Sequence, residues 1–434
     1  MYQKVKLNSI AIRRLFLVIT IFLAQVSVQA QDNEDVGQYR SSRTRYMDLI
    51  HTKLEVSFDW EHQYLNGIAT LDLTPYFFPQ SDLVLDAKGM DIHSVHIQTG
   101  DKAYHLPFTF DGNELEIDLE EEFTRGDTLR IKIAYQAKPN ERKVGGSDAI
   151  KSDKGLYFIN PLNEENGKPQ QIWTQGETES NSVWFPTIDA PNERCTQEMY
   201  ITVGEKFKTL SNGLLIRSTD NLDGTRTDYW NMDLPHAPYL FMMAVGEFAS
   251  VEDKWNGISL TYMVEPEYQK YAKDIFGNTP EMMTFFSELL GVNYPWQKYT
   301  QVVVRDYVSG AMENTTASVF MEGLQANRRE LMDESKDDII AHELFHQWFG
   351  DLVTTESWSN VTLNEGFATY SEYLWDEHKY GVEMADYNFL SAKEGYLDEA
   401  KEDPKSLIRY YYDTREDMFD RHSYNKGGWV VHML

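Results

Sequence analysis

The sequence has very little cysteine and no long stretch that is apolar throughout. Its single cysteine, Cys195, excludes a disulfide within the chain and leaves the redox compartment undecided. We expect this thiol to be buried, because an unpaired cysteine behaves as a small apolar side chain. No apolar run reaches the roughly 20 residues that a membrane-spanning helix needs, and there is no internal repeat or low-complexity tract. A disulfide scaffold and a repeat protein are therefore excluded.

Basic side chains are scarce relative to acidic ones. The chain has 40 lysines and arginines against 69 aspartates and glutamates, which gives a formal net charge of -29. This excess repels nucleic acid and anionic membranes, so no nucleic-acid partner is expected, and it mildly favours cationic ligands. A hydrophobic fraction of 41% with 25% charged residues is typical of a globular protein. At 434 residues the chain exceeds the size of one ordinary core, so we expect two domains.

The amino terminus has the pattern of a signal peptide, which we place at residues 1–30. Basic residues precede an apolar run at 15–24, and no acidic residue occurs before Asp32. Small residues at Val28 and Ala30 suit cleavage before Gln31. Export to the periplasm or the medium is expected, without stable membrane insertion after cleavage. An uncleaved anchor is the alternative, whereas the lack of a cysteine in this segment excludes a lipid-modified one.

A polar leader at 31–46 is followed by a region in which apolar residues alternate with polar ones. The alternation at 54–60, 69–73, 115–119 and 129–135 predicts strands, and Asn66-Gly67 predicts a turn between the first two. We therefore expect an N-terminal β domain over residues 47–255. Within it, residues 140–154 are predicted to be an exposed loop.

Residues 256–434 are expected to form a second, mainly helical domain. A helix is predicted to start at an N-cap, Asp333 or Ser335, and to end at Gly350. Another is predicted over 362–380, with Gly381 as its stop signal.

The first of these helices carries a motif that suits a metal. His342 and His346 are four residues apart, so both imidazoles lie on one face and can reach one ion. Glu365 opens the next helix and would complete a set of three ligands with an open position, the arrangement of catalytic zinc. Two purely structural alternatives remain. The histidines bind no metal, or Glu365 caps its helix together with Thr362. Glu372, two turns after Glu365, either orients a ligand histidine or is an ordinary solvated glutamate.

At this point the sequence resembles a known family, the gluzincin aminopeptidases typified by alanyl aminopeptidase. The resemblance is carried by His342 to Asp351, Leu363 to Ala368 and Gly310 to Asn314, and also by Thr174 to Glu177 and Tyr424 to Gly427. It extends from about Tyr46 to the end of the chain. It implies an α+β multidomain fold, in which a saddle-shaped antiparallel β domain precedes a thermolysin-like, mainly helical catalytic domain.

The resemblance also implies roles at the matching positions. One Zn²⁺ per chain is held by His342, His346 and Glu365, and Glu343 is the general base that takes a proton from a zinc-bound water. Tyr424 donates a hydrogen bond to the oxyanion. The substrates are peptides with a free amino terminus. The residues that bind them would be the ammonium-binding pair Glu177 and Glu313, the pocket residue Gln175, and the motif residues Gly310, Ala311 and Met312.

The sequence departs from the family pattern in two respects. Thr362 and Thr315 occupy positions where the family commonly has aromatic residues, so we expect an altered side-chain preference. The chain ends ten residues after Tyr424, whereas relatives continue, so we expect the catalytic domain to be cut short.

An epoxide hydrolase of the leukotriene hydrolase type is one alternative function, although Glu177 argues against it. A non-catalytic scaffold is the other. The oligomeric state is not indicated.

Overall fold

The computed structural model describes residues 37–147 and 149–434. The predicted signal peptide, residues 1–30, and the first part of the polar leader lie outside the described residues, so both stay predictions. The remainder of the leader contains strand β1 (Gln38–Tyr39), which pairs with β22 (Tyr411–Tyr412) near the other end of the chain. Among the described residues, no helix has the length and apolar character needed to cross a membrane.

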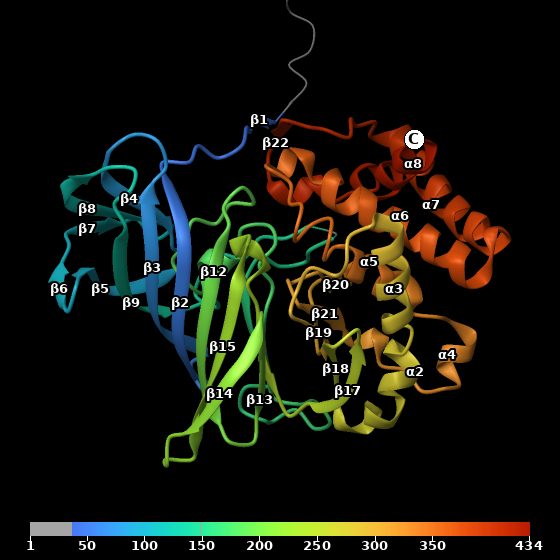
Figure 1. Ribbon diagram of the computed structural model, residues 1–434, viewed down its shortest axis with the longest axis horizontal. Coiled ribbons are helices and arrows are strands. Elements are labelled where there is room, and N and C mark those ends of the chain that lie inside the picture. Colours follow the sequence, from blue (N-terminus) through green and yellow to red (C-terminus); the bar gives the residue numbers. More distant parts are fainter. Residues whose placement is uncertain (1–36, 148) are drawn as a thin grey trace, which may run out of the picture.

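The first half of the chain folds around an eight-stranded sheet, on the left in Figure 1. Buried and less buried side chains alternate along its central strands, as the sequence pattern predicts. In sheet order its strands are β14 (Leu214–Asp220), β15 (Thr225–His236), β12 (Cys195–Gly204), β2 (Met47–Asp59), β3 (Tyr64–Pro75), β9 (Leu129–Ala137), β5 (Met90–Thr99) and β6 (Lys102–His105).

Two smaller sheets complete this half of the molecule. One has the order β4 (Gln80–Asp86), β8 (Glu114–Phe123) and β7 (Phe108–Phe110). The other, which leads towards the site described below, consists of β10 (Leu156–Ile159), β11 (Gln171–Thr174), β16 (Met243–Gly246) and β13 (Lys208–Ser211). The predicted N-terminal β domain is therefore present. One neighbouring pair, β2 with β12, is parallel, which the long connection between these strands allows.

The turn predicted at Asn66-Gly67 is wrong. Both residues lie inside β3, and the chain reverses before Tyr64, where Gln63 has a positive φ of 59°. Gly67 is needed for packing, because a Cβ there would lie 2.3 Å from Cζ of Tyr135 on the neighbouring strand. A glycine can mark such a close approach as well as a turn, and the sequence does not distinguish the two.

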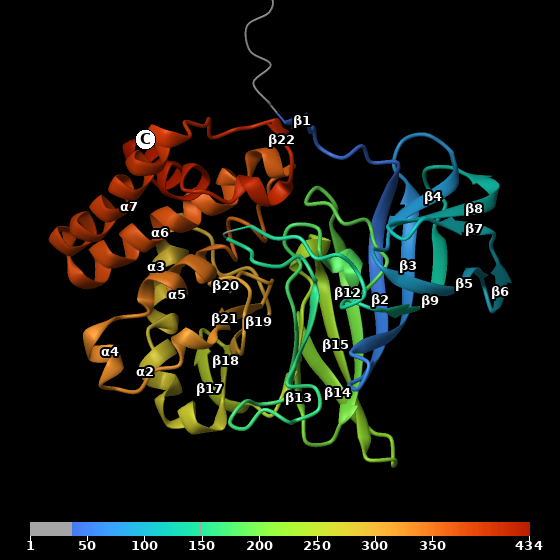
Figure 2. The same cartoon turned by 180° about the vertical axis from the view of Figure 1, so that it is seen from behind.

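The second half of the chain contains a five-stranded sheet covered by helices, on the right in Figure 1 and from behind in Figure 2. Its strands, in sheet order, are β17 (Ala249–Trp255), β18 (Ile258–Val264), β19 (Lys298–Val304), β21 (Ala317–Met321) and β20 (Ala311–Met312). The predicted domain boundary at 255 falls at the end of β17. The change from one sheet to the next lies earlier, between β16 and β17, since Asn256-Gly257 is the turn of the β17–β18 hairpin.

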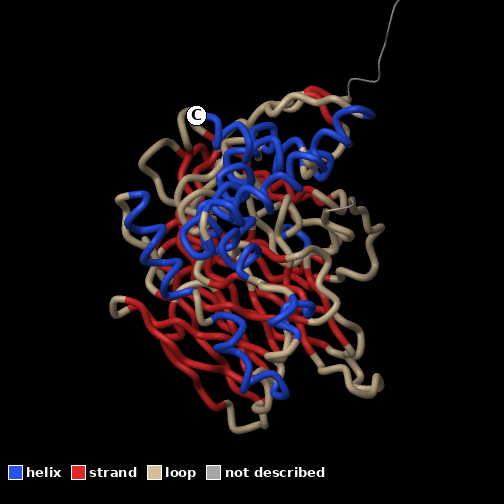
Figure 3. Tube along the Cα trace, turned by 90° about the vertical axis from the view of Figure 1, so that its right-hand side faces the viewer, coloured by secondary structure: helices blue, strands red, loops and turns tan. Residues whose placement is uncertain are grey.

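The helices of this half surround the predicted metal motif, and Figure 3 shows the C-terminal end of the chain among them at the top. They are α2 (Ala272–Phe276), α3 (Thr279–Leu290), α4 (Glu330–Asp333), α5 (Asp337–Phe345), α6 (Thr362–Tyr380), α7 (Val382–Glu402), α8 (Gly427–Met433) and the π-helical turn η7 (His422–Lys426). Short 3-10 turns are η1 (Asn181–Val183), η2 (Pro238–Leu240), η3 (Pro266–Tyr271), η4 (Glu322–Leu324), η5 (Trp358–Asn360) and η6 (Arg415–Met418). The predicted order of a β domain followed by a mainly helical domain is confirmed.

The helix that carries the two histidines begins almost where the sequence predicts. Neither candidate cap is the N-cap residue, which is Lys336. Ser335 lies one residue earlier, and its Oγ accepts a hydrogen bond of 3.2 Å from the main-chain N–H of Asp337. Asp333 instead ends α4. The regular helix stops at Phe345, before the predicted end at Gly350.

Candidate active site

The three predicted ligands meet at the contact between α5 and α6. His342 and His346 lie on α5 or at its end, and Glu365 lies in the first turn of α6. The Nε2 atoms of the two histidines are 3.3 Å and 3.4 Å from the same oxygen of Glu365, Oε2. All three side chains are buried. One oxygen and two imidazole nitrogens therefore converge on one point from two helices.

The other nitrogen of each imidazole fixes its orientation. Nδ1 of His346 is 2.9 Å from the carbonyl oxygen of Phe349, which can only accept, so this nitrogen carries the proton. Nδ1 of His342 is 2.6 Å from Oε1 of Glu372, and a carboxylate imposes the same tautomer. The Nε2 atoms of both histidines therefore face Glu365 and are the atoms left for a metal ion. Of the two alternatives for Glu372, the solvated glutamate is excluded by this contact.

The alternative in which Glu365 caps its own helix is also wrong. The N-cap residue of α6 is Val361, and no side chain caps this helix. The carboxylate instead faces the imidazoles. Although burial acts to raise the pKa of Glu365, the neighbouring His346 and His342 lower this pKa to about 2.

The carboxylates of Glu313 and Glu365 favour a positive charge at His346. Burial acts to lower the pKa of His346, but Glu313 and Glu365 raise it to about 10. The protein therefore favours a positive charge between its carboxylates. Together with the converging donors and the outer hydrogen bonds, this fits a zinc ion bound by two histidines and one glutamate.

Glu343 lies next to His342 on α5 and faces the same cavity. This cavity has a volume of about 320 Å³, and its walls include the three ligands, Glu343 and Tyr424. The side chain of Glu343 is only 6% exposed. Burial raises the pKa of this carboxyl to about 8, against the lowering effect of His342 and His346. A buried carboxyl beside the ligands can accept and return a proton there.

Two further glutamates, Glu177 and Glu313, reach the cavity from different halves of the chain. Glu177 follows β11, and Glu313 follows β20. Oxygen atoms of both lie within 4.8 Å of each other and of Glu365. Burial, and the negative charge of Glu313 and Glu365, raise the pKa of Glu177 well above its ordinary value. Within the described part of the chain, Oε1 of each has no hydrogen-bond partner. This pair is built to receive a cationic group.

The chain around Gly310 and Ala311 forms a free edge beside the cavity. Ala311–Met312 is strand β20, which pairs on one side with β21 and ends the sheet. Gly310 and Ala311 line the cavity. An extended peptide can add to such an edge through main-chain hydrogen bonds.

Gln175 and Met312 are buried close together but are not among the residues that line this cavity. Nε2 of Gln175 donates to Sδ of Met312 at 3.4 Å, and Tyr307 donates its hydroxyl to Oε1 of Gln175 at 2.5 Å. Their predicted contact with substrate stays a prediction.

The loop predicted to be exposed at 140–154 reaches the cavity, through Ala149 and the buried Ile150. For Ile150, exposure was therefore wrong.

Tyr424 also lines the cavity. It lies in the π-helical turn η7, and its ring stacks on His342 with the centroids 6.1 Å apart and the planes at 18°. Burial and nearby carboxylates, among them Glu365 and Glu177, raise the pKa of its hydroxyl well above the ordinary value. The hydroxyl therefore keeps its proton and can donate it in a hydrogen bond.

Gln347 is a buried residue of the site that the sequence analysis did not single out. Its Nε2 donates to the carbonyl oxygen of Glu313 at 2.8 Å, and its Oε1 accepts from the main-chain N–H of Thr316 at 2.9 Å. The residue that follows the second ligand histidine thus holds the loop that carries Glu313. Its position directly after His346 gives no sign of this contact.

The fold and the site together define a class: a β domain joined to a helical domain that holds a histidine, histidine and glutamate ligand set. Comparison with protein families is more specific. Residues 46–240 match the description Peptidase M1 N-terminal domain, and residues 275–434 match Peptidase family M1 domain. The chain belongs to peptidase family M1.

Individual relatives agree with this assignment. The chain is 30% identical to glutamyl aminopeptidase of Homo sapiens over 346 residues, which are 71% of this chain and 35% of that protein. It is 25% identical to aminopeptidase B of Rattus norvegicus over 440 residues, 94% of this chain and 62% of that one. The chain thus spans less than two thirds of the length of these relatives.

Solved structures share the fold. An M1 zinc metallopeptidase from Deinococcus radiodurans has a TM-score of 0.70 at 21% identity, covering 90% of this chain and 83% of that one. Native yeast LTA4 hydrolase has a TM-score of 0.75 at 22% identity, covering 93% of this chain and 61% of that one.

Proposed function

We propose that this protein is a zinc-dependent aminopeptidase, which hydrolyses the bond after the first residue of a peptide. The observation that carries the proposal is the position of Glu177 and Glu313. Their unpartnered oxygens lie beside the ligand set, so a bound amino terminus is held close to the metal. A free α-ammonium is the cation that this pair accepts, and its position fixes which peptide bond reaches Glu343.

A zinc ion would supply Lewis-acid chemistry at this site. One zinc ion, held by His342, His346 and Glu365, would polarise the scissile carbonyl and make a water more acidic. Glu343 takes the proton of the attacking water and passes it to the leaving amine, which becomes a good leaving group. Glu372 and the carbonyl of Phe349 keep the two imidazoles in the required orientation.

Tyr424 acts on the oxygen that gains charge during the attack. Its hydroxyl is protonated and fixed before the reaction starts, so it need not reorganise as the negative charge develops. The free edge of β20 at Gly310 and Ala311 holds the peptide extended across the cavity. The amino-terminal pattern at residues 1–30 supports export of the enzyme to the periplasm or the medium.

The substitution Glu343→Ala tests this proposal. Because it removes the proton carrier but no ligand, hydrolysis of aminoacyl anilides should fall about 10²- to 10⁴-fold, with one zinc per chain retained. Glu334→Ala is the matched control, since Glu334 is exposed and precedes the same helix. A purified protein that is fully active without zinc, or a Glu343→Ala variant of unchanged activity, contradicts the proposal.

A further inference from the structure

The turn that carries Tyr424 is held by Asp420, which lies two residues before the turn begins. The main-chain oxygen of Asp420 accepts hydrogen bonds from the N–H groups of Ser423 and Tyr424, at 3.0 Å and 3.1 Å. Its carboxylate oxygen Oδ1 accepts from the N–H groups of His422 and Ser423, both at 3.0 Å. A π-helical turn is rare and often occurs at functional sites. Here one aspartate satisfies its first main-chain donors.

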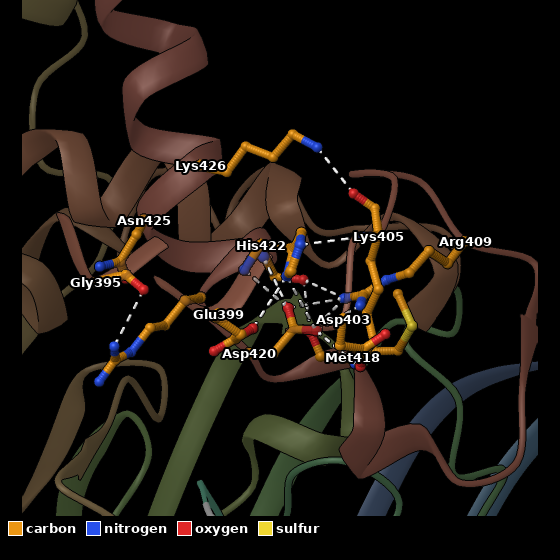
Figure 4. Close-up of polar contacts among 12 residues, drawn as sticks. Gly395, Glu399, Asp403, Lys405, Arg409, Met418, Asp420, His422, Asn425 and Lys426 are labelled. Atoms are coloured by element: carbon orange, nitrogen blue, oxygen red, sulfur yellow. Dashed lines mark hydrogen bonds and ion pairs between the residues drawn. The ribbon is translucent and has the colours of Figure 1, made fainter. Parts of the chain in front are cut away.

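Asp420 is in turn clamped by Arg409, as Figure 4 shows. The guanidinium forms two hydrogen bonds with the two carboxylate oxygens, and both side chains are largely buried, with exposed fractions of 10% and 13%. Nη2 of Arg409 also donates to the carbonyl of Met418 at 3.1 Å and to Oγ of Ser423 at 2.9 Å. Burial acts to raise the pKa of Asp420, but Arg409 outweighs this effect and the pKa is lowered. The pair is therefore ionised and rigid.

The same turn is attached to the helix that carries Glu365. Thr362, the first residue of α6, donates its hydroxyl to the carbonyl oxygen of Ser423 at 2.9 Å. One turn later, Gly366 meets Gly427 so closely that a Cβ on Gly366 would lie 3.1 Å from the Gly427 Cα. Arg409 itself donates its main-chain N–H to the carbonyl of Ser359, just before α6. The position of Tyr424 relative to the metal ligands thus depends on this network.

A metal site is the competing explanation, since donor atoms of Glu399, Asp420 and His422 lie within 4.8 Å of one another. The contacts in Figure 4 argue against it. Nε2 of His422 accepts the main-chain N–H of Lys405 at 3.0 Å, so its Nδ1 carries the proton and donates to Glu399. The cations of Lys405 and Arg409 already contact Asp420. The two ring nitrogens of His422, Oε1 of Glu399 and the carboxylate of Asp420 are therefore already paired within the protein.

We infer that Arg409 and Asp420 are positioning residues, which hold the Tyr424 hydroxyl where the oxyanion forms. This inference rests on the proposed function, because it assumes the role of Tyr424 given there. A group that acts only in the transition state affects kcat and leaves substrate binding nearly unchanged. Displacement of a reacting group by about 1 Å can cost about 10²-fold in rate. Loss of the pair should therefore lower kcat through Tyr424.

The first test compares three variants of the full chain with aminoacyl anilides as substrate. Asp420→Asn and Arg409→Lys should each lower kcat about 10- to 100-fold with KM changed less than about threefold. The matched control is Asp403→Asn, because Asp403 pairs with Lys405 in the same cluster but makes no hydrogen bond to the turn. Its kcat should be unchanged. Ser423→Ala, which removes only the hydroxyl between Arg409 and Met418, replaces Asp420→Asn if that variant does not fold.

The second test is a double-mutant cycle with Tyr424→Phe. If Asp420 acts through the Tyr424 hydroxyl, Asp420→Asn should cost less than about threefold in the Tyr424→Phe background. A loss of kcat that is equally large in both backgrounds overturns the positioning role and leaves the proposed function intact. If Tyr424→Phe alone leaves kcat unchanged, the oxyanion role is wrong and the inference falls with it.

Discussion

At the scale of single residues, the site is defined as much by outer contacts as by ligands. Glu372 contacts Nδ1 of His342 at 2.6 Å and so keeps Nε2 free for the metal. Loss of such an outer carboxylate typically weakens metal binding about 10- to 100-fold. We predict this loss for Glu372→Gln, measured by zinc competition with a chelator. Glu377→Gln, on the exposed side of the same helix, should bind zinc as the parent does. Equal affinity in all three proteins would leave Glu372 without a role in binding.

The second residue-scale prediction concerns the pair of carboxylates for the amino terminus. Glu177→Gln removes one charge opposite the ammonium, and a hydrogen bond to a charged group contributes about 1.5–3 kcal/mol. The value of kcat/KM for substrates with a free amino terminus should fall about 10- to 100-fold, mainly through KM. Glu165→Gln serves as control, because Glu165 is exposed and lies in the loop that precedes β11. The assignment would be contradicted if Glu177→Gln bound these substrates normally.

The sequence predicts those parts of the site in which the contacting residues are close together in the chain. The ligands follow from local spacing, because residues four apart share one helix face. The clamp of Arg409 on Asp420 has no such pattern, and Gln347 contacts a loop about thirty residues away. Such contacts exist only once the chain is folded. The roles of Glu177 and Glu313 came from resemblance alone, and the structure contributes their mutual proximity.

At the scale of elements, periodicity predicted the strands and helices well but misplaced some of their ends. α6 spans the residues expected of it, since Gly381 supplies a clear stop. The turn at Asn66-Gly67 failed because Gly67 makes room for Tyr135, a partner more than sixty residues away. α5 ends early because the chain tightens after Phe345, where the N–H groups of Gln347 and Trp348 bond to carbonyl oxygens three residues back.

The first residue of strand β19, Lys298, gives a prediction about stability. Its buried Nζ donates to the carbonyl of Thr316 at 3.0 Å, and burial lowers the pKa of this amine to about 7. Between about pH 7 and 10 the unfolded chain binds a proton here that the folded chain does not, so stability rises with pH. Lys298→Met removes this dependence. The free energy of unfolding of Lys298→Met minus that of the parent should be largest below pH 7. This difference should fall by up to roughly 5 kcal/mol towards pH 10.

Denaturant unfolding at several pH values measures this difference, and titrations elsewhere in the chain cancel in the comparison. Lys208→Met is the control, because Lys208 is exposed on β13. Its difference from the parent should stay constant with pH. A constant difference for Lys298→Met as well would show that the buried amine does not titrate in this range.

At the scale of the whole molecule, the site exists because the two halves of the chain meet. The small sheet containing β11 places Glu177 from the first half, whereas β20 places Glu313 from the second. The metal ligands alone would serve any hydrolysis at a carbonyl. The β domain adds the second carboxylate, which in the proposed function binds a free amino terminus. The resemblance implies a neutral side chain at this position in the epoxide hydrolase branch, so the charged Glu177 argues against that alternative.

The most direct test is the ratio of kcat/KM for one peptide with a free amino terminus and the same peptide with that terminus acetylated. In the proposed function Glu177 and Glu313 bind the free ammonium, and acetylation removes this group and leaves the two buried carboxyls without their partner. The account predicts release of the first residue from the free peptide, at least about 10²-fold more efficiently than any cleavage of the blocked one. Equal cleavage of the two peptides would contradict the proposal that this is an aminopeptidase.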